Sequence, residues 1–375
     1  MRRATVLLIF AAIGAMALAG CRSMPVNSNP SCDPCTRYLP DGGIPPACRD
    51  LAAEVESLTE LEAGRRYENL VFEGGGVKGV AYAGVLQVLD RNELLAPVER
   101  VAGTSAGAIT ALLISLGYEA EEMCSIIFNM DFRDFNDASR STLSNLNRLR
   151  WRYGWYRGDF ALCMLRCLVE KKTGSKDTTF AQLHQRATQD NSPFRELFVV
   201  GTDLNLHQVR VFSYQTTPDV ALADAVRISM SIPLYFGARE LDGQIFVDGG
   251  VLWNYPIQIF DETTDPETTL GFNLGTIAMP AEIRDLEQYL ENLATTFFDA
   301  QVEELCRTKT DIRRSAFINP LGISTTDFDL TTEQKRALMA EGRKGTEQFL
   351  AHPGERDSCP QWLNKLLAAR RPGAI

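Results

Sequence analysis

Histidine is scarce in this 375-residue chain, which contains only His184, His207 and His352. None of the three lies beside a glycine-rich strand end, so chemistry that depends on histidine has few candidates. Basic residues are also in the minority, because 38 Lys and Arg face 48 Asp and Glu and the formal net charge is −10. This balance argues against a broad basic surface, and we expect no nucleic-acid partner. A hydrophobic content of 45% excludes a disordered chain and predicts one or two packed domains.

The apolar run near the N-terminus, residues 6–18, is too short to cross a bilayer comfortably. It follows two arginines and ends in Leu18-Ala19-Gly20-Cys21, an arrangement typical of a secretory signal. The cysteine after Leu-Ala-Gly resembles the lipobox of bacterial lipoproteins, which implies that residues 1–20 are a signal peptide and that Cys21 becomes the lipidated N-terminus. Because no acid stands second in the mature chain, the resemblance also implies an anchor in the outer membrane, facing the periplasm. The alternative is an ordinary secretory signal in which Cys21 is incidental.

Nine cysteines are present, so eight remain beside Cys21. An even number in an exported chain predicts disulfides, although the sequence leaves their pairing open. The Cys32-Asp-Pro-Cys35 motif also fits a redox or zinc site. No histidine lies near it and no second motif of this kind completes a metal set, so a structural disulfide is the preferred interpretation. We expect no metal and no cofactor.

The rest of the chain divides by composition. Residues 22–47 are rich in Pro, Ser, Asn and Gly, which predicts a spacer, and a charged helix is expected at about 49–65. Downstream, strand-like apolar runs alternate with helical patterns, which predicts an α/β protein whose sheet is covered on both faces. Strands are expected at 69–72, 98–102, 197–202, 209–214, 244–247 and 269–273, and long amphipathic helices at 281–307 and 331–350.

A glycine-rich loop, Glu73-Gly74-Gly75-Gly76-Val77-Lys78-Gly79, follows the first predicted strand. Consecutive glycines let backbone N–H groups converge on an anion at a helix N-terminus. The spacing is not that of a Walker phosphate loop, and no acid follows at the distance of a dinucleotide-binding motif, so a tight turn is the alternative. Lys78 is expected to be a solvated surface lysine rather than a group that orients phosphate.

The segment Gly103-Thr104-Ser105-Ala106-Gly107 lies between a predicted strand and an apolar helix, as a nucleophile elbow does. Small residues must flank the serine there, because the strand and the helix approach each other closely. Asp248-Gly249-Gly250 follows another strand and by itself indicates only a turn. A serine nucleophile needs a base within about 2.6–3.2 Å, and Asp248 is the natural candidate if burial raises its pKa.

In this order, the three segments resemble the patatin-like phospholipase family. Three supporting segments, Gly201–Leu204, Val211–Ser213 and Ala225–Pro233, carry the resemblance further, and it covers about residues 67–330. The resemblance implies a three-layer α/β/α fold with a central, mostly parallel sheet. The expected organisation is then a signal peptide (1–20), an anchored tether with a short helix (21–66), a catalytic domain (67–330) and a C-terminal helical extension (331–375).

The same resemblance implies a lipid acyl hydrolase of the phospholipase A or lysophospholipase type that works without a metal. Ser105 would be the nucleophile and Asp248 its base. The resemblance assigns Gly74, Gly75, Gly76 and Gly79 to the oxyanion hole, Gly103 and Gly107 to the elbow, and Gly249 and Gly250 to the turn after the catalytic aspartate. The expected partners are a lipid substrate and, through Cys21, a membrane.

Two alternatives remain open at this point. One is a Ser105–Asp248–His352 triad, although His352 stands at an expected helix end, where capping is the simpler role. The other is a non-catalytic envelope lipoprotein that binds lipid. Asp203, at a strand end, is expected to be structural rather than catalytic.

The segment 128–160 is unusually aromatic. Its aromatic side chains either line an acyl pocket, meet a lipid interface, or pack into the core or a lid. They include Phe132, Phe135, Trp151, Tyr153, Trp155 and Tyr156.

Overall fold

The computed structural model of the protein describes residues 44–49, 66–139, 141–275, 283–284 and 286–369. The chain divides into two units, Met1–Cys32 and Asp33–Ile375, and every described residue belongs to the second. The predicted signal peptide, Cys21, the Cys32–Cys35 motif and almost all of the helix predicted at 49–65 lie outside the described residues. Within the described ranges, no helix combines the length and apolarity that a bilayer crossing requires.

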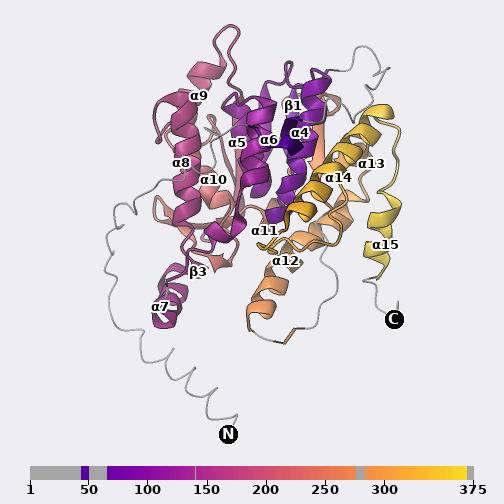
Figure 1. Cartoon of the computed structure of the whole chain (residues 1–375). Helices are drawn as coiled ribbons and strands as arrows, with labels where there is room; N and C mark the ends of the chain where they lie inside the picture. The colour runs from indigo at the N-terminus through magenta and orange to yellow at the C-terminus, as the bar shows by residue number, and fades with distance from the viewer. Residues whose placement is uncertain (1–43, 50–65, 140, 276–282, 285, 370–375) are drawn as a thin grey trace. The chain divides into compact units, whose positions relative to one another are not determined.

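An eight-stranded, mostly parallel sheet forms the centre of the second unit (Figure 1). Its order is β10-β9-β1-β2-β4-β8-β7, with β5 paired to β4 off this path. The parallel strands are β1 (Asn69–Phe72), β2 (Arg100–Gly103), β4 (Glu196–Asp203), β9 (Thr269–Asn273) and β10 (Ser315–Phe317). The antiparallel ones are β5 (Gln208–Phe212), β7 (Arg239–Leu241) and β8 (Gln244–Asp248). All six predicted strands are present; the short β7 and β10 were not expected.

Side chains alternate between the two faces of the sheet, and each face builds its own core. On β1, Leu70 and Phe72 belong to one hydrophobic cluster and Val71 to the other, and on β2 Val101 and Ala102 divide in the same way. This two-residue period is that of strands covered by helices on both faces. The three-layer α/β/α fold with a mostly parallel sheet is therefore confirmed.

Helices supply the outer layers. The first cluster includes side chains from α4 (Ala81–Arg91), α5 (Ala106–Ser115), α6 (Ala120–Asn129), α8 (Asp159–Thr173), α9 (Phe180–Ala187), α10 (Leu222–Ser229) and α14 (Thr332–Ala351). The second includes side chains from α12 (Leu286–Leu305), α13 (Lys309–Arg313) and α15 (Gln361–Ala369). The two long helices predicted at 281–307 and 331–350 are α12 and α14.

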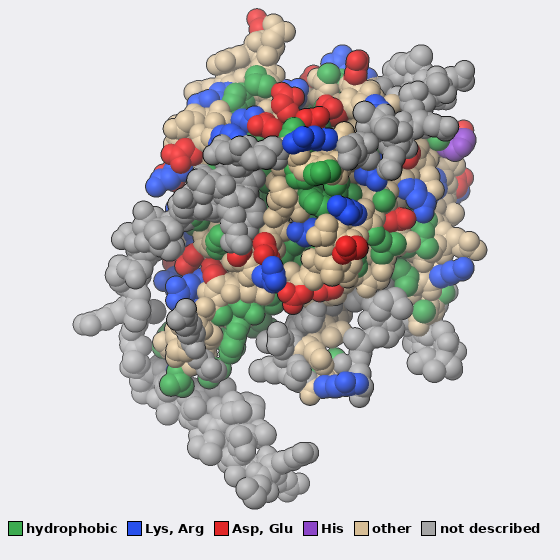
Figure 2. Space-filling view, in the orientation of Figure 1, with side chains coloured by type: hydrophobic (Ala, Val, Ile, Leu, Met, Phe, Trp, Pro, Cys, Tyr) green, Lys and Arg blue, Asp and Glu red, His purple; other side chains and the backbone are tan. Residues whose placement is uncertain are grey.

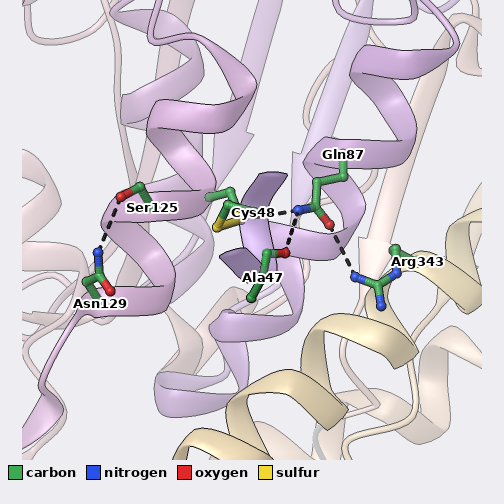
Figure 3. Close-up of a disulfide and its surroundings, with 7 residues drawn as sticks. Ala47, Cys48, Gln87, Ser125, Asn129 and Arg343 are labelled. Carbon is green, nitrogen blue, oxygen red and sulfur yellow. Dashed lines mark hydrogen bonds between the residues drawn. A yellow bond between two sulfur atoms is a disulfide. The ribbon is translucent and has the colours of Figure 1, made fainter. Parts of the chain in front are cut away.

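Disulfides join distant parts of the chain. Cys48, on the short helix α3 (Pro46–Arg49), is bonded to Cys124 of α6, and Cys306 is bonded to Cys359. Figure 3 shows the first of these beside Gln87, whose Nε2 donates to Cys124 Sγ at 3.3 Å. On α8, two further cysteines, Cys163 and Cys167, are also disulfide-bonded. The prediction of disulfides is confirmed for these six cysteines.

Replacing both Cys48 and Cys124 with alanine should lower the free energy of unfolding by about 2–4 kcal/mol. The bond closes a loop with a sequence separation of 76, so it restricts the unfolded chain strongly. Urea denaturation of the double variant measures the loss. The Cys306→Ala/Cys359→Ala variant is a matched comparison. The sequence separation of these two cysteines is 53, so we expect a similar loss of stability. An unchanged urea midpoint in the first variant would contradict the prediction.

Candidate active site

The turn between β2 and α5 holds Ser105 in a backbone conformation that L-residues rarely adopt, with φ 52° and ψ −118°. Cβ atoms added at Gly103 and Gly107 would lie 2.3 Å from the carbonyl oxygens of Gly107 and Phe72 respectively. Neither position has room for a side chain. Steric exclusion by the backbone therefore explains why an elbow needs small residues on both sides of the serine. The Ser105 side chain is 7% exposed and therefore lies just below the surface.

Ser229, the last residue of α10, holds the backbone of the elbow through a hydrogen bond. Its Oγ accepts a hydrogen bond from the Ser105 N–H at 2.9 Å and donates one to the Val200 carbonyl at 2.5 Å. One buried hydroxyl thus connects α10, β4 and the elbow. The sequence assigned no role to Ser229, since its two partners lie far away along the chain.

Strand register brings Asp248 to the same place. Gly103, at the end of β2, pairs with Val199 of β4, and Asp248, at the end of β8, pairs with Gly201 of that same strand. Although β8 runs antiparallel, its last residue therefore lies beside the turn that holds Ser105. The structure brings together the two residues that the sequence predicted as nucleophile and base.

The Asp248 carboxylate is fully buried, and this burial raises its pKa to about 7. The Gly250 N–H, the Ser105 hydroxyl and the charge of Arg227 each lower this pKa to a smaller extent. Oδ1 accepts the Gly250 N–H at 2.8 Å, whereas Oδ2 has no hydrogen-bond partner of ordinary geometry among the described residues. Oδ2 is therefore free to take a proton, and a carboxyl group with a pKa near neutrality suits general-base catalysis.

Gly249 and Gly250 begin the short helix α11 (Gly250–Trp253) rather than an open turn. A Cβ at Gly249 would lie 2.3 Å from the Val200 carbonyl oxygen, so this position must stay small for β8 to reach its place. Gly250 orients the Asp248 carboxylate through its N–H. Both glycines thus position Asp248.

The glycine loop after β1 continues into a 3-10 helix, η2 (Gly76–Val80). The N–H of Gly74 donates to the Asn254 carbonyl at 3.0 Å. Within the described part of the chain, the N–H groups of Gly75 and Gly76 make no hydrogen bond, and so they can bind an anion. Gly79 lies inside η2, where a Cβ would lie 2.8 Å from the Ala106 Cβ, so its contribution is close packing against the elbow.

The prediction that Lys78 is a solvated surface lysine is wrong, because its side chain is buried. The reason is local geometry: the 3-10 turn of η2 directs this position inward, and four of the five residues of η2 are buried. A lysine in a glycine-rich loop offered no sequence signal of this burial.

A buried carboxylate braces the loop. Glu73 precedes the glycines; its Oε2 accepts the Leu274 N–H at 2.5 Å and its Oε1 accepts Asn254 Nδ2 at 3.2 Å. Asn254 Nδ2 also donates to the Gly74 carbonyl at 3.0 Å. These contacts tie the ends of β1 and β9 to the residue that follows α11. The sequence missed Asn254, which belongs to no motif.

Arg227 is a third residue, after Ser229 and Asn254, whose role the sequence did not predict. It is buried on α10, and its Nε, Nη1 and Nη2 donate to Gly158 O, Ser231 Oγ and Arg157 O at 2.8, 2.7 and 2.9 Å. Burial lowers its pKa to about 10, so it stays charged at neutral pH. Its positive charge favours the ionised form of Asp248.

The remaining predictions concern His352 and Asp203. The His352 side chain is 72% exposed, and its Nδ1 lies 3.4 Å from Glu355 Oε2, so the structure does not bring it to Asp248. Asp203 Oδ1 accepts the N–H groups of Asn205 and Leu206, contacts that hold the turn after β4. Among the described residues, no three His, Cys, Asp or Glu side chains form a group that could hold a metal ion.

A Gly76→Ala substitution should lower kcat by about 10²–10³-fold, the usual cost of losing one oxyanion donor. Gly76 has φ +55°, and an added Cβ would lie 2.1 Å from the Thr325 carbonyl oxygen, so the N–H must shift. Steady-state kinetics measures the change. Gly322→Ala is a matched control: its φ is +74° with nothing within 4 Å of the new Cβ, so it should keep full activity. Equal kcat values for Gly76→Ala and the wild type would exclude this loop as the oxyanion hole.

The protein thus combines a three-layer α/β/α fold with an elbow serine and a buried aspartate. Residues 70–261, about half of the chain, match the model of the family described as patatin-like phospholipase. The chain belongs to this family, which places it among the lipid hydrolases.

Two relatives and one solved structure are similar to this chain over more than half of its length. The chain is 32% identical over 309 residues to the uncharacterized protein YqhO of Bacillus subtilis strain 168, covering 76% of this chain and 98% of the relative. It is 26% identical over 201 residues to the "Probable lipid hydrolase 463L" of Invertebrate iridescent virus 6, covering 52% of this chain and 63% of that protein. Among solved structures, VipD from Legionella pneumophila has a similar fold, with a TM-score of 0.54 and 18% identity over 82% of this chain and 73% of VipD.

Proposed function

We propose that the protein is a lipid acyl hydrolase of the phospholipase A or lysophospholipase type that cleaves carboxylic esters through Ser105 and Asp248. The observation that carries this proposal is the fully buried Asp248, with a pKa of about 7 and an unpartnered Oδ2, beside the elbow serine. Family membership and the relative named as a lipid hydrolase support an acyl lipid as the substrate.

In the first half of the reaction, Asp248 takes the Ser105 hydroxyl proton while Oγ attacks the ester carbonyl carbon. The negative charge that develops on the carbonyl oxygen is stabilised by the N–H groups of Gly75 and Gly76. The ester C–O bond then breaks, and the proton on Asp248 passes to the alcohol that leaves. In the second half, Asp248 deprotonates a water molecule, which attacks the acyl carbon. The bond between that carbon and Ser105 Oγ then breaks, the proton on Asp248 returns to Oγ, and the fatty acid is released.

The test uses vesicles of a single phospholipid and mass spectrometry of the products. We expect free fatty acid and lysophospholipid, both abolished when the protein is treated beforehand with a serine-directed fluorophosphonate, and we expect that reagent on Ser105. The non-catalytic alternative predicts neither product nor label. Equal product from treated and untreated protein would overturn the proposal.

The His352→Ala variant should hydrolyse esters at the wild-type rate. The His352 imidazole of the wild type is exposed and lies beside Glu355, so its removal should leave the site unchanged. The measurement is kcat/KM on a soluble ester, and a loss as large as that of a catalytic residue would restore the Ser–Asp–His triad.

We also propose that the chain is a lipoprotein, anchored through Cys21 in the outer membrane and facing the periplasm. The lipobox-like sequence before Cys21 supports this, and so do the Cys48–Cys124 and Cys306–Cys359 disulfides, which persist in oxidising compartments. Radioactive palmitate should label the protein in bacterial cells and should not label Cys21→Ala. Equal labelling of both would overturn the anchor, and membrane fractionation tests its location.

A further inference from the structure

Helix α7 (Thr142–Arg152) presents apolar side chains to solvent. Leu143 is 79% exposed, Trp151 58%, Tyr153 50% and Leu146 49%. No described side chain of α7 belongs to either hydrophobic cluster of the body. In Figure 1 α7 lies at the lower end of the described unit, and Figure 2 shows hydrophobic side chains gathered there. So many large apolar side chains on one short element indicate an interaction surface.

The charge of this element is opposite to that of the whole chain. Residues 142–157 contain four arginines and no acid, whereas the chain has a net charge of −10. Arg150, Arg152 and Arg157 are exposed, and the Arg150 guanidinium lies 5.1 Å from the Trp151 ring centroid. Arginines beside leucine and tryptophan on one short helix are typical of helices that bind the surface of an anionic bilayer.

The base of α7 is firmly held, so the exposed side chains are displayed by an ordered element. Before it, Asp137 accepts the N–H groups of Arg157, Gly158, Asp159 and Phe160 at 2.6–3.2 Å. These contacts fix the segment before α7 to the start of α8.

Within α7, Asn145 Oδ1 accepts the Ser139 N–H and its Nδ2 donates to the Ser139 carbonyl, both at 2.9 Å. After the helix, β3 (Gly154–Tyr156) pairs with β6 (Leu234–Phe236). The buried Asn145 of α7 is thus hydrogen-bonded, whereas Leu143, Leu146 and Trp151 are exposed to solvent.

The same contacts connect α7 to the catalytic residues. The strand β6 follows Ser231 closely, and the Ser231 carbonyl accepts the Asp248 N–H at 2.9 Å. Arg227 joins Ser231 to the carbonyls of Arg157 and Gly158, next to β3. These hydrogen bonds link the segment that follows α7 to the backbone of Asp248.

We propose that Leu143, Leu146, Arg150, Trp151, Arg152 and Tyr153 form a docking surface for an anionic lipid bilayer, which we call the α7 surface. Leucine and tryptophan enter the boundary between head groups and acyl chains, and the two arginines contact lipid phosphates. This proposal adds a binding partner and does not require that the bound lipid be hydrolysed.

The test uses the full chain with Ser105→Ala and Cys21→Ser, so that neither hydrolysis nor acylation at Cys21 contributes. Partition is measured by co-sedimentation with vesicles of phosphatidylcholine alone or mixed with phosphatidylglycerol. We expect the mixed vesicles to bind more protein, and Arg150→Glu/Arg152→Glu to weaken that binding at least about tenfold. Lys176→Glu/Lys365→Glu changes the net charge equally at two other exposed positions and should bind as before.

A second readout follows Trp151 directly. Brominated lipids in the mixed vesicles should quench tryptophan fluorescence, and Trp151→Phe should remove most of that quenching. Leu143→Asn/Leu146→Asn should weaken partition, whereas Leu204→Asn/Leu206→Asn, two exposed leucines after β4, should not. Urea midpoints confirm that each variant is folded.

The absence of Trp151 quenching, or equal partition of α7 variants and their controls, would overturn the α7 surface and leave a protein partner as its occupant. Hydrolysis of a soluble ester by the wild type would be unaffected by that result, so the two proposals can fail separately.

Discussion

Ser105→Ala is expected to lower ester hydrolysis by at least about 10⁴-fold, the scale of loss when a serine hydrolase loses its nucleophile. Only the Oγ atom is removed, and without it no acyl-enzyme forms. The elbow hydrogen bond from residue 105 to Ser229 uses the backbone N–H, so the fold around the site should persist. Single-turnover release of fatty acid and circular dichroism of the same sample measure the two effects.

Ser105→Gly provides the matched control. It should be as inactive as Ser105→Ala but more stable by about 1 kcal/mol, because glycine adopts φ 52° without a steric penalty. This difference would show that the elbow stores strain at the nucleophile. Equal unfolding free energies for the two variants would argue against strain, and residual hydrolysis by both would argue against Ser105 as nucleophile.

Asp248→Asn is expected to lower kcat/KM by about 10²–10⁴-fold, because an amide cannot accept the Ser105 proton. The wild-type pH profile should report the same group. With its pKa of about 7, Asp248 is protonated at lower pH, so kcat/KM should fall about tenfold per unit below that value and level off above it. A profile governed by a pKa near 4 would mean that Asp248 is not the base.

The same substitution should stabilise the protein at alkaline pH. The pKa of Asp248 is raised from 3.8 to about 7, so between these values the folded state holds a proton that the unfolded state releases. Wild-type stability from this group is therefore greatest below about pH 4 and falls as pH rises to about 7, by roughly 1.4 kcal/mol per unit. Asparagine has no such dependence, so the variant should exceed the wild type at about pH 8 by a few kcal/mol. Urea denaturation at about pH 5 and pH 8 measures this crossover.

Local geometry explains why several site residues were predictable. An elbow needs small residues at positions 103 and 107, and the structure places backbone oxygens where their side chains would be. The strands at 69–72 and 269–273 have the predicted bounds because they are short apolar runs bounded by polar or flexible residues. Such features depend on neighbours in the chain, and so a sequence pattern reveals them.

Other parts of the site depend on partners that no local pattern reveals. Ser229 reaches the Ser105 N–H across 124 residues, and Asn254 reaches Glu73 across 181. Lys78 was expected in solvent and is buried, because its environment is set by the turn that η2 makes after the glycines. Hydrogen bonds and burial at these positions are properties of the packed layers.

The scarcity of histidine was informative from the start, because it made a carboxylate the natural base for Ser105. The sequence alone predicted six strands of the central sheet, the elbow, the glycine loop and Asp248 as the candidate for that carboxylate. Only the tertiary structure decided which glycine N–H groups are free, how Asp248 acquires a pKa near 7, and that α7 leaves its apolar side chains in solvent. The physical reason is that backbone conformation follows from neighbouring residues, whereas desolvation and hydrogen-bond partners arise when distant segments pack together.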